Sequence, residues 1–443
     1  MEFFPMNSKR VALITNERTY RYCEIPRVHF DSFDKELIVI VCENTIDVLG
    51  AYTSALNSGH ATMLLPKDMN RELLERVMDS YQPKWIVGLE SFEGYVVKEQ
   101  KLVRLQRSTV TIHPDLALLL STSGTTGSQK FVRLSYKNLK ANAESIKEYL
   151  SIDEHECAVM NLPLSYSYGM SIVNSHLLAK ASILLTDDSV MEQSFWSLVK
   201  KHKATSLAGV PFTYQMLQRI GFFKMDLPDL TTLTEAGGRL NEKLVVAFAN
   251  YAKQQDKCFF VMYGQTEAAP RISYIPHNQV LKKSSSIGIA IPGGKLTIDK
   301  ETDELIYRGP NVMMGYAESL NDLAKGDELN GMLHTGDTAV VDEDGYFTIT
   351  GRLKRFIKLF GLRINLDEIE RTLEKEFQIT VACAGNDDKL VIAVEEEAVV
   401  ETVKVVVEKY YKLHRTAYKI NVLPIPRLAN GKIDYVKVKE TYI

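Results

Sequence analysis

The sequence predicts a large α/β body, a smaller β-rich unit after it, and a further C-terminal region. Between residues 36 and 263, short apolar runs alternate with segments of helical periodicity, and this alternation indicates parallel strands with helices on the sheet faces. After about residue 290, polar turns separate pairs of short apolar runs, which is typical of hairpins. From about residue 353, the chain continues with strands, a long helix and a polar loop.

The predicted strands of the body are short, mostly apolar runs bounded by polar or turn residues. In chain order they are Glu36–Cys42, Ala61–Leu65, Lys84–Leu89, Leu116–Ser121, Cys157–Leu162, Ser182–Leu185, Thr205–Val210 and Cys258–Tyr263. The predicted helices carry apolar residues along one side, as Ile46, Leu49 and Leu56 do in the first of them. In order they are Thr45–Asn57, Arg71–Tyr81, Asn138–Leu150, Met170–Lys180, Phe195–His202 and Leu240–Lys253.

Two hairpins are predicted in the β-rich unit. Lys295–Asp299 and Glu304–Arg308 flank the polar turn KETD, and Asp337–Val341 and Tyr346–Ile349 flank the turn DEDG. Polar residues and glycine between short apolar runs are hairpin signals. In the C-terminal region, Val399–Leu413 has the length and spacing of a helix.

Composition excludes several classes of protein. Hydrophobic residues make up 45% of the 443-residue chain and charged residues 25%, which is ordinary for a globular protein. The 53 basic and 56 acidic residues give a net charge of −3, so we expect no nucleic-acid partner. Because no apolar run is long enough for a bilayer and the N-terminus lacks a signal-peptide pattern, we expect a cytoplasmic protein with no membrane span.

A loop of small hydroxyls, glycines and a lysine follows the strand Leu116–Ser121; its sequence through Lys130 is STSGTTGSQK. Glycines allow backbone N–H groups to crowd an anion, and the hydroxyls and the lysine add hydrogen bonds and positive charge. The loop differs from a Walker A loop, because Gln129 stands at the second glycine position and Phe131 follows the lysine. A flexible surface loop is the alternative, but the position after a buried strand favours a phosphate site.

The loop is similar to the phosphate-binding motif of the adenylate-forming superfamily, which contains acyl-CoA synthetases, adenylation domains and luciferases. Further segments resemble motifs of that superfamily in the same order along the chain. They are Tyr263–Glu267, Tyr307–Tyr316, His334–Asp337, Gly351–Arg352, Lys358–Glu370 and Asn430–Ile433. One matching loop has little specificity, but an ordered set of this kind is highly specific.

This resemblance implies a fold and a domain division. The expected fold is a large multi-sheet α/β N-terminal domain over residues 1–352, with a β-rich subdomain at about 290–352, and a small mobile α+β C-terminal domain over residues 354–443. Lys354 falls at the hinge position of the superfamily. The small domain would carry the catalytic lysine.

The resemblance also implies an activity: ATP- and Mg²⁺-dependent conversion of a small-molecule carboxylic acid into an acyl-adenylate. A thioester would then form with coenzyme A or with the phosphopantetheine of an acyl carrier protein. Lys432 and Thr266 are the implied catalytic residues, together with Glu267, which would also bind the metal. The implied nucleotide-binding residues are Thr122, Ser123, Gly124, Thr125, Thr126, Gly127, Lys130, Gly237, Gly238, Tyr263, Gly264, Thr266, Asp337, Arg352 and Lys432. The implied substrate pocket involves Tyr166, Tyr168, Val210, Pro211 and Ala268.

Several residues depart from the superfamily pattern. Gln129 and Phe131 replace its usual Pro and Gly, and Tyr166 stands where His is frequent. The segment Ser165–Tyr168 contains no acid that could hold an α-ammonium group, which disfavours a simple amino acid as substrate because a buried unpaired ammonium is costly. The alternatives are an amino-acid adenylation enzyme for a carrier protein, a nucleotide-binding relative without turnover, and a luciferase-like oxygenase.

Overall fold

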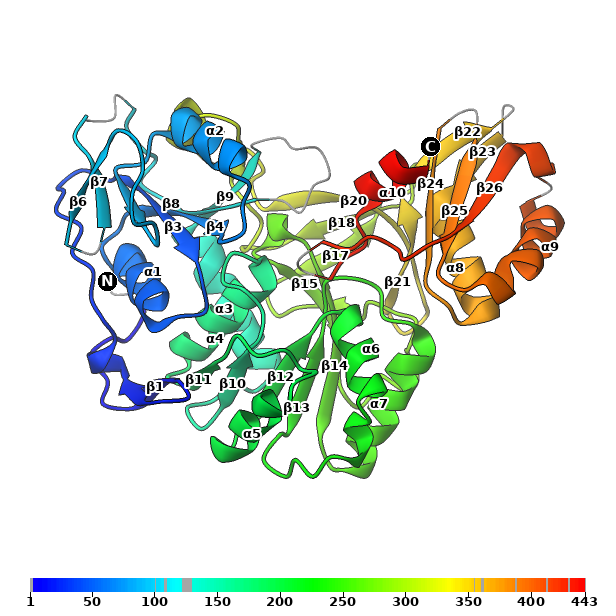
Figure 1. The fold of residues 1–443 in the computed structure, drawn as a ribbon, viewed down its shortest axis with the longest axis horizontal. Coiled ribbons are helices and arrows are strands. Elements are labelled where there is room, and N and C mark those ends of the chain that lie inside the picture. The colour runs from blue at the N-terminus through cyan, green and yellow to red at the C-terminus, as the bar shows by residue number, and fades with distance from the viewer. Residues whose placement is uncertain are drawn as a thin grey trace.

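The computed structural model arranges the chain as two large sheets, a small antiparallel sheet and a C-terminal α+β unit (Figure 1). It describes residues 3–99, 101–106, 110–121, 130–353, 355–359, 362–386, 389–411, 413–428 and 431–442. The fold therefore agrees with the expected large multi-sheet α/β domain followed by a small α+β domain.

The first large sheet contains the early strands of the body. Its order is β19 (Gly315–Ala317), β9 (Phe131–Ser135), β8 (Leu116–Ser121), β4 (Ala61–Pro66), β3 (Leu37–Cys42), β5 (Trp85–Val87), β7 (Lys101–Arg104) and β6 (Tyr95–Lys98). The neighbours β8, β4, β3 and β5 run parallel, whereas β9 is antiparallel to β8. Helices α1 (Ile46–Asn57) and α2 (Arg71–Tyr81) belong to this half, and α1 begins where the Thr45 side chain accepts a hydrogen bond from Val48 N.

The second large sheet follows the alternation that the sequence predicts. Its order is β16 (Ile289–Ala290), β15 (Arg271–Ile275), β14 (Cys258–Gly264), β13 (Thr232–Glu235), β12 (Ser206–Gly209), β10 (Cys157–Met160), β11 (Ser182–Leu185), β1 (Val11–Ile14) and β2 (Thr19–Arg21). The neighbours from β14 to β1 run parallel. Helices α5 (Gln193–Lys201), α6 (Pro211–Arg219) and α7 (Glu242–Gln254) pack on one face of it.

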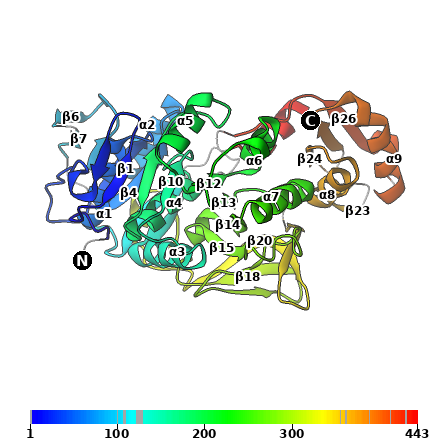
Figure 2. The same ribbon diagram turned by 90° about the horizontal axis from the view of Figure 1, so that it is seen from below.

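Helices α3 (Tyr136–Tyr149) and α4 (Ser167–Leu178) lie between the two sheets, as Figure 2 shows from below. One continuous core joins Leu118 of the first sheet, Ile183 of the second and Met170 of α4, all fully buried. Nearly every residue of α4 is buried, polar ones included, as expected of a helix enclosed on all sides. The start of α4 is thereby held against the second sheet.

The small antiparallel sheet consists of β17 (Lys295–Ile298), β18 (Glu304–Arg308), β20 (Met332–Val341) and β21 (Phe347–Arg352). Both predicted hairpins are present, since β17 pairs with β18 and β20 with β21. The second hairpin sets Asp337 directly opposite Arg352, so two predicted site residues are neighbours through strand register.

The C-terminal unit contains a hairpin, a mixed sheet and three helices. In order its elements are β22 (Phe356–Leu359), β23 (Leu362–Asn365), α8 (Leu366–Phe377), β24 (Val381–Gly385), β25 (Leu390–Val394), α9 (Val400–Tyr411), β26 (Tyr418–Val422) and α10 (Tyr435–Tyr442). Ile369 and Leu373 of α8 pack with Ile392 of β25 and Val407 of α9 in a core of their own. The predicted helix Val399–Leu413 corresponds to α9.

Short 3-10 helices complete the described chain. They are Tyr22–Glu24, Phe222–Lys224, Thr266–Ala268, Leu320–Ala324, Glu397–Val399 and Arg415–Ala417. Within the described ranges, no helix is long and apolar enough to traverse a bilayer.

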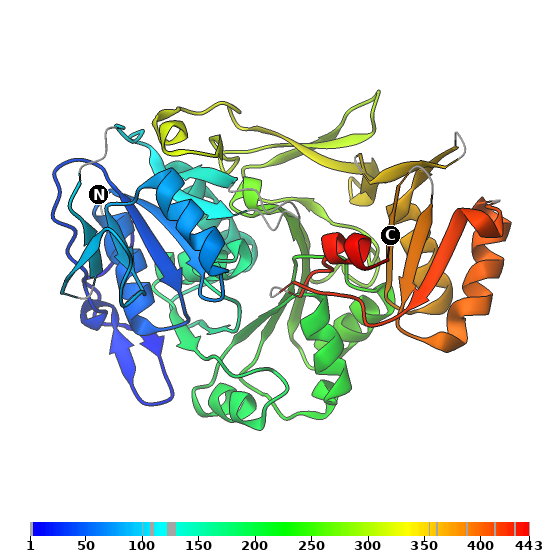
Figure 3. The same ribbon diagram turned by 45° about the horizontal axis from the view of Figure 1, so that its top comes forward.

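Several residues of the C-terminal unit contact the body, and its last segment runs back toward the second sheet (Figure 3). Arg371 Nη1 of α8 donates to the Ile349 carbonyl of β21 at 2.8 Å. The Arg427 guanidinium lies 5.3 Å from the centre of the Phe212 ring at the start of α6. These contacts bring the polar loop before α10 to the carboxyl edge of the sheet.

Candidate active site

The site lies where the central strands of the second sheet end. Because β12, β13 and β14 are parallel neighbours, their carboxyl ends meet at one edge, where ligands of open α/β sheets bind. Gly237 follows β13 with φ +94°, and a Cβ at this position would clash with the Tyr166 hydroxyl. The turn therefore requires glycine for its backbone conformation and for the space beside Tyr166.

Asp337 is the most densely hydrogen-bonded acid of this edge. It is 3% exposed. Its Oδ2 accepts from the Tyr263 hydroxyl at 2.5 Å and from Gln265 Nε2 at 3.1 Å, and its Oδ1 accepts from Arg352 Nε at 3.0 Å. Burial and the neighbouring Asp337 raise the pKa of Tyr263 well above its usual value, so Tyr263 remains a neutral donor. The carboxylate is thus held in one orientation from three sides.

Glu267 and Lys130 both contact Tyr316, a residue of β19 in the first sheet. The Tyr316 hydroxyl donates to Glu267 Oε1 at 2.9 Å, and Lys130 Nζ lies 3.7 Å from the centre of the Tyr316 ring. Thr266 Oγ1 donates to Ser167 Oγ at 3.2 Å, at the start of α4. A cation, a carboxylate and a hydroxyl are therefore gathered beside the end of β14.

Lys432 reaches this edge from the C-terminal unit. Leu428 N donates to the Lys432 carbonyl and Gly431 N to the Leu428 carbonyl, each at 2.8 Å, which closes a tight turn. Lys432 Nζ lies 5.7 Å from the centre of the Tyr166 ring. The turn thus brings a cation from residue 432 next to residues of the body more than 200 positions earlier in the chain.

The charges around Lys432 come from the predicted nucleotide site. Burial and the nearby Arg352 lower the pKa of Lys432, while Glu267 and Asp337 oppose that shift. Burial raises the pKa of the neighbouring Tyr166 to about 12, so its hydroxyl stays protonated at neutral pH. Lys432 therefore sits among both candidate acids and the candidate arginine.

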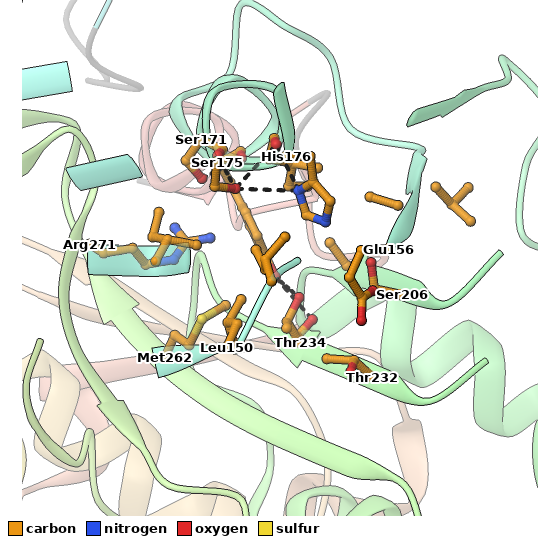
Figure 4. A pocket seen from close by; sticks show the side chains of 17 residues that line it. Leu150, Glu156, Ser171, Ser175, His176, Ser206, Thr232, Thr234, Met262 and Arg271 are labelled. Atoms are coloured by element: carbon orange, nitrogen blue, oxygen red, sulfur yellow. Dashed lines mark hydrogen bonds between the residues drawn. The ribbon is translucent and has the colours of Figure 1, made fainter. Parts of the chain in front are cut away.

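The predicted pocket residues fall into three groups. Tyr168 lines a cavity beneath α4 (Figure 4), and the centre of its ring lies 6.3 Å from the centre of the Tyr166 ring. Val210 and Pro211 instead lie against the glycine turn after β13. Ala268 is fully buried and its carbonyl accepts from Asn311 Nδ2 at 2.6 Å.

Some predicted residues lie outside the described ranges. They are Thr122, Ser123, Gly124, Thr125, Thr126, Gly127, Gln129, Lys354 and Asn430. Gly238 and Gly264 are described: Gly238 borders Pro211, and Gly264 ends β14, where a Cβ would overlap the Pro270 carbonyl. The close approach at Gly264 explains why that position carries glycine.

Sequence reasoning missed several polar residues of the site. Gln265 and Tyr316 lie within segments that resemble motifs, but the resemblance gives them no role, and their hydrogen bonds reach across 72 and 49 positions. Glu235 and Arg271 are also buried, at 1% and 3% exposure. A charged residue at the buried end of a strand was the available signal for both.

Comparison with known proteins identifies the family. A family model described as AMP-binding enzyme matches residues 33–317. The chain belongs to this family. Among curated members of the AMP-binding enzyme family, it is 30% identical over 276 residues to a feruloyl-CoA synthase of Amycolatopsis, covering 58% of this chain and 54% of the relative. It is 30% identical over 336 residues to a long-chain-fatty-acid–CoA ligase of Salmonella typhimurium, covering 69% and 57%. The chain thus spans a little over half the length of these curated relatives.

Solved structures share the fold over nearly the whole chain. The o-succinylbenzoate CoA synthetase MenE of Bacillus subtilis, in complex with its acyl-adenylate intermediate, superposes with a TM-score of 0.76 at 19% identity, covering 97% of this chain and 95% of MenE. ATP-bound MatB of Rhodopseudomonas palustris superposes with a TM-score of 0.76 at 20% identity, covering 98% and 96%. At this identity the likeness establishes the fold of the AMP-binding enzymes for this chain.

Proposed function

We propose that the protein is an AMP-forming acid–thiol ligase, which activates a small carboxylic acid with ATP and passes the acyl group to a thiol. The convergence of Lys432, Glu267 and Asp337 at one sheet edge carries the proposal. A buried cation, an oxygen ligand for a metal and an acceptor for a diol are the groups that adenylation of a carboxylate uses. The names of the relatives, feruloyl-CoA synthase and long-chain-fatty-acid–CoA ligase, support the same chemistry.

Asp337 is the proposed acceptor for the ribose hydroxyls of ATP. A carboxylate oxygen accepts more than one hydrogen bond, so Oδ1 can accept from a hydroxyl besides Arg352. The base and ribose would lie along Tyr263, Gly264 and the glycine turn Gly237–Gly238. The phosphates would lie at the loop that ends in Lys130, of which residues 122–129 fall outside the described ranges.

Mg²⁺ fits Glu267, because a carboxylate is a hard oxygen ligand at the phosphate end of the site. Within the described residues, no three His, Cys, Asp or Glu side chains are grouped to hold a metal. Phosphate oxygens and water would therefore supply the other ligands, as is usual for Mg²⁺. When bound, the ion would neutralise negative charge on the phosphate oxygens.

In the first step, a carboxylate oxygen of the acid attacks the α-phosphorus of ATP, and the bond to the pyrophosphate oxygen breaks. Lys432 can contact both the attacking carboxylate and the α-phosphate, and it stabilises the negative charge that develops on the α-phosphate oxygens. The low polarity that depresses the Lys432 pKa also strengthens this interaction, since Coulomb energy rises as the effective dielectric falls. Thr266 would act as a further donor to phosphate once its single hydroxyl hydrogen turns from Ser167 Oγ to a phosphate oxygen.

For the second step we infer that the unit over residues 354–443 turns about Lys354 and withdraws Lys432. A thiol sulfur then attacks the acyl carbon while its proton passes to solvent, the bond from that carbon to the phosphate oxygen breaks, and AMP leaves as the thioester forms. The domain division and the hinge rest on the superfamily resemblance, since Lys354 lies outside the described residues. Coenzyme A is the proposed acceptor because the curated relatives are named for it; carrier-protein phosphopantetheine is the other candidate.

We place this activity in the cytoplasm, where ATP and coenzyme A are supplied. All five cysteines, Cys23, Cys42, Cys157, Cys258 and Cys383, carry free thiols, which suits a reducing compartment. Cell fractionation tests the assignment: recovery in an extracellular or periplasmic fraction would overturn it.

Acid-dependent exchange of labelled pyrophosphate into ATP tests the proposed function. The panel contains aromatic acids, short and long fatty acids, dicarboxylates and amino acids, each with and without coenzyme A. The proposal predicts exchange with an acid that is not an amino acid, and an acyl-CoA when coenzyme A is added. Exchange with amino acids alone favours the carrier-protein adenylation enzyme. ATP binding without exchange for any acid favours a relative without turnover.

A further inference from the structure

A cavity lies beneath α4, between that helix and the central strands of the second sheet (Figure 4). Its apolar walls include Ile146, Ile172 and Met262, but hydroxyls, a histidine, an arginine and the acidic side chain of Glu156 also line it. In Figure 4, Arg271 reaches into the space between Ser171 and Ser175 on one side and Met262 on the other. A cavity beside the adenylation edge that contains a charged side chain is equipped to recognise a polar group of the acid.

Arg271 is held rigidly at the start of β15. Its carbonyl accepts from Asn311 Nδ2 at 2.8 Å, and its guanidinium lies 4.1 Å from the centre of the Tyr168 ring. Arg271 is only 3% exposed. Within the described part of the chain, its Nε has no hydrogen-bond partner. A buried donor that faces a cavity without a partner is unusual and points to a missing acceptor.

Nearby groups leave the charge of Arg271 incompletely matched. The Tyr149 hydroxyl accepts a hydrogen bond from the Arg271 guanidinium. Glu235 interacts with the same guanidinium through charge alone. Glu235 is 1% exposed, and burial raises its pKa well above the usual value although Arg271 opposes the shift. Burial thus disfavours the charged form of Glu235 beside the guanidinium, and an anion from outside would complete the site.

The positions of three aromatic contacts relate this cation to the reaction centre. Lys432 Nζ lies 5.7 Å from the Tyr166 ring centre, the Tyr166 and Tyr168 rings are 6.3 Å apart, and Arg271 stacks on Tyr168. Lys432 Nζ therefore lies beside one ring of this tyrosine pair and the Arg271 guanidinium beside the other. An acid whose reacting carboxylate lies at Lys432 would reach Arg271 by passing the Tyr166 and Tyr168 rings.

The remaining polar lining favours a short, polar acid over a long apolar one. His176 is 5% exposed, and its Nε2 has no partner among the described residues. Ser206 and Thr232 lie further along the same cavity. A fatty-acyl chain would bury these groups without hydrogen bonds, which costs free energy for each group left unpaired.

We propose that Arg271 binds a second carboxylate of the substrate, so that the acid activated here is a short dicarboxylic acid. The fork of the guanidinium matches a carboxylate through parallel hydrogen bonds, and Tyr168 fixes its plane. This inference rests on the proposed function, because it assumes that the reacting carboxylate lies at Lys432. It assigns specificity to a residue for which the motifs give no role.

Matched pairs of acids test the proposal by pyrophosphate exchange: succinate against butanoate, and glutarate against pentanoate. The wild-type protein is expected to use the diacid with a kcat/KM roughly 100-fold above that of the monoacid of equal length, because a desolvated guanidinium left unpaired penalises the monoacid. In Arg271→Gln, the KM for the diacid rises by a similar factor and the penalty on the monoacid is relieved, while the KM for ATP stays unchanged. Arg271→Lys retains part of the preference, and Arg76→Gln, at an exposed position of α2, behaves as wild type.

Equilibrium binding separates failure of this inference from failure of the proposed function. The ligands are two acyl-sulfamoyladenosines, one ending in a carboxylate and one in a methyl group, titrated calorimetrically into wild type and Arg271→Gln. Tighter binding of the carboxylate form, lost in the variant, supports the role of Arg271 even if no acid gives exchange, in which case the proposed function alone fails. Equal binding of both forms, or exchange with monoacids in preference to diacids, overturns the inference and leaves the ligase function standing. Circular dichroism melting confirms that each variant is folded, and Arg271→Lys replaces Arg271→Gln if the latter is not.

Discussion

Tyr316 links the two ends of the proposed phosphate site. Its ring faces Lys130 and its hydroxyl donates to Glu267 Oε1. A partner that orients a metal-binding carboxylate affects metal affinity even though it does not touch the ion. The role of Tyr316 can therefore be tested without removing either charged group.

Tyr316→Phe is expected to raise the Mg²⁺ concentration needed for half-maximal exchange by about 10-fold, because Glu267 loses its orienting hydrogen bond. The ring remains under Lys130, so the melting temperature should change little. The measurement is pyrophosphate exchange against Mg²⁺ at saturating ATP, with Tyr20→Phe on β2 as control. An unchanged Mg²⁺ dependence would contradict the assignment of Glu267 to the metal.

His176 makes stability depend on pH. Burial lowers its pKa from 6.5 to about 4, although the Ile172 carbonyl opposes the shift. A base whose pKa is depressed in the folded state contributes stability above its unfolded pKa, and this contribution is lost as pH falls from 6.5 toward 4. The full loss corresponds to about 3 kcal/mol.

His176→Gln is expected to have a shallower decline of unfolding free energy between pH 7 and pH 5 than wild type. Urea unfolding at several pH values measures how the unfolding free energy of each protein changes with pH. Because only these slopes are compared, a constant difference in stability between the two proteins does not affect the test. Parallel curves for the two proteins would show that His176 is not held neutral in the folded state.

The turn after β13 requires glycine for its backbone conformation and for the space beside a neighbouring side chain. Gly237 has φ +94°, and a Cβ there would clash with the Tyr166 hydroxyl. Gly345, in the turn between β20 and β21, has φ +82°, and a Cβ added there would meet no atom within 4 Å. The two glycines thus share a positive φ but differ in surroundings.

Gly237→Ala and Gly345→Ala are both expected to lose about 1 kcal/mol of stability, since an L residue is strained at positive φ. Only Gly237→Ala should raise the KM for the acid, because Tyr166 must move. Thermal unfolding and exchange kinetics measure the two effects. A raised acid KM in Gly345→Ala as well would mean that strain alone, and not the displacement of Tyr166, alters the site.

Elements with a continuous apolar run were predictable from sequence. The run Glu36–Cys42 corresponds to β3, and Thr45–Asn57 corresponds to α1 with Thr45 as its cap. The strand β9 was missed because Arg133 interrupts its apolar run. That arginine is fully buried, hydrogen-bonded to the Tyr316 carbonyl and paired with Glu328, so tertiary partners far along the chain make the strand possible.

The candidate site was predictable only as far as local motifs reach. Glu267, Asp337 and Lys432 each follow from a short segment. Their mutual distances, and the partners Tyr316 and Gln265, depend on strand register and on packing between separate sheets. Arg271 could be identified as unusual from its apolar strand, but only the folded chain shows that it lines a cavity.

At the scale of the whole molecule, the C-terminal unit has a core separate from that of the body. Leu373 is fully buried in it, against β25 and α9. Leu373→Ala is expected to destabilise this unit by roughly 2–5 kcal/mol. Amide hydrogen exchange should then show lost protection in β24, β25 and β26, with β13 and β14 unaffected. Lost protection throughout the body would contradict a unit that folds by itself.

The central claim is that an acid and ATP react where the turn carrying Lys432 meets the carboxyl edge of the second sheet. Acid-dependent pyrophosphate exchange in Lys432→Ala, beside Lys437→Ala at an exposed position of α10, tests it most directly. The account predicts that Lys432→Ala loses at least about 100-fold in exchange while still binding AMP, and that Lys437→Ala keeps wild-type exchange. Undiminished exchange in Lys432→Ala would contradict it.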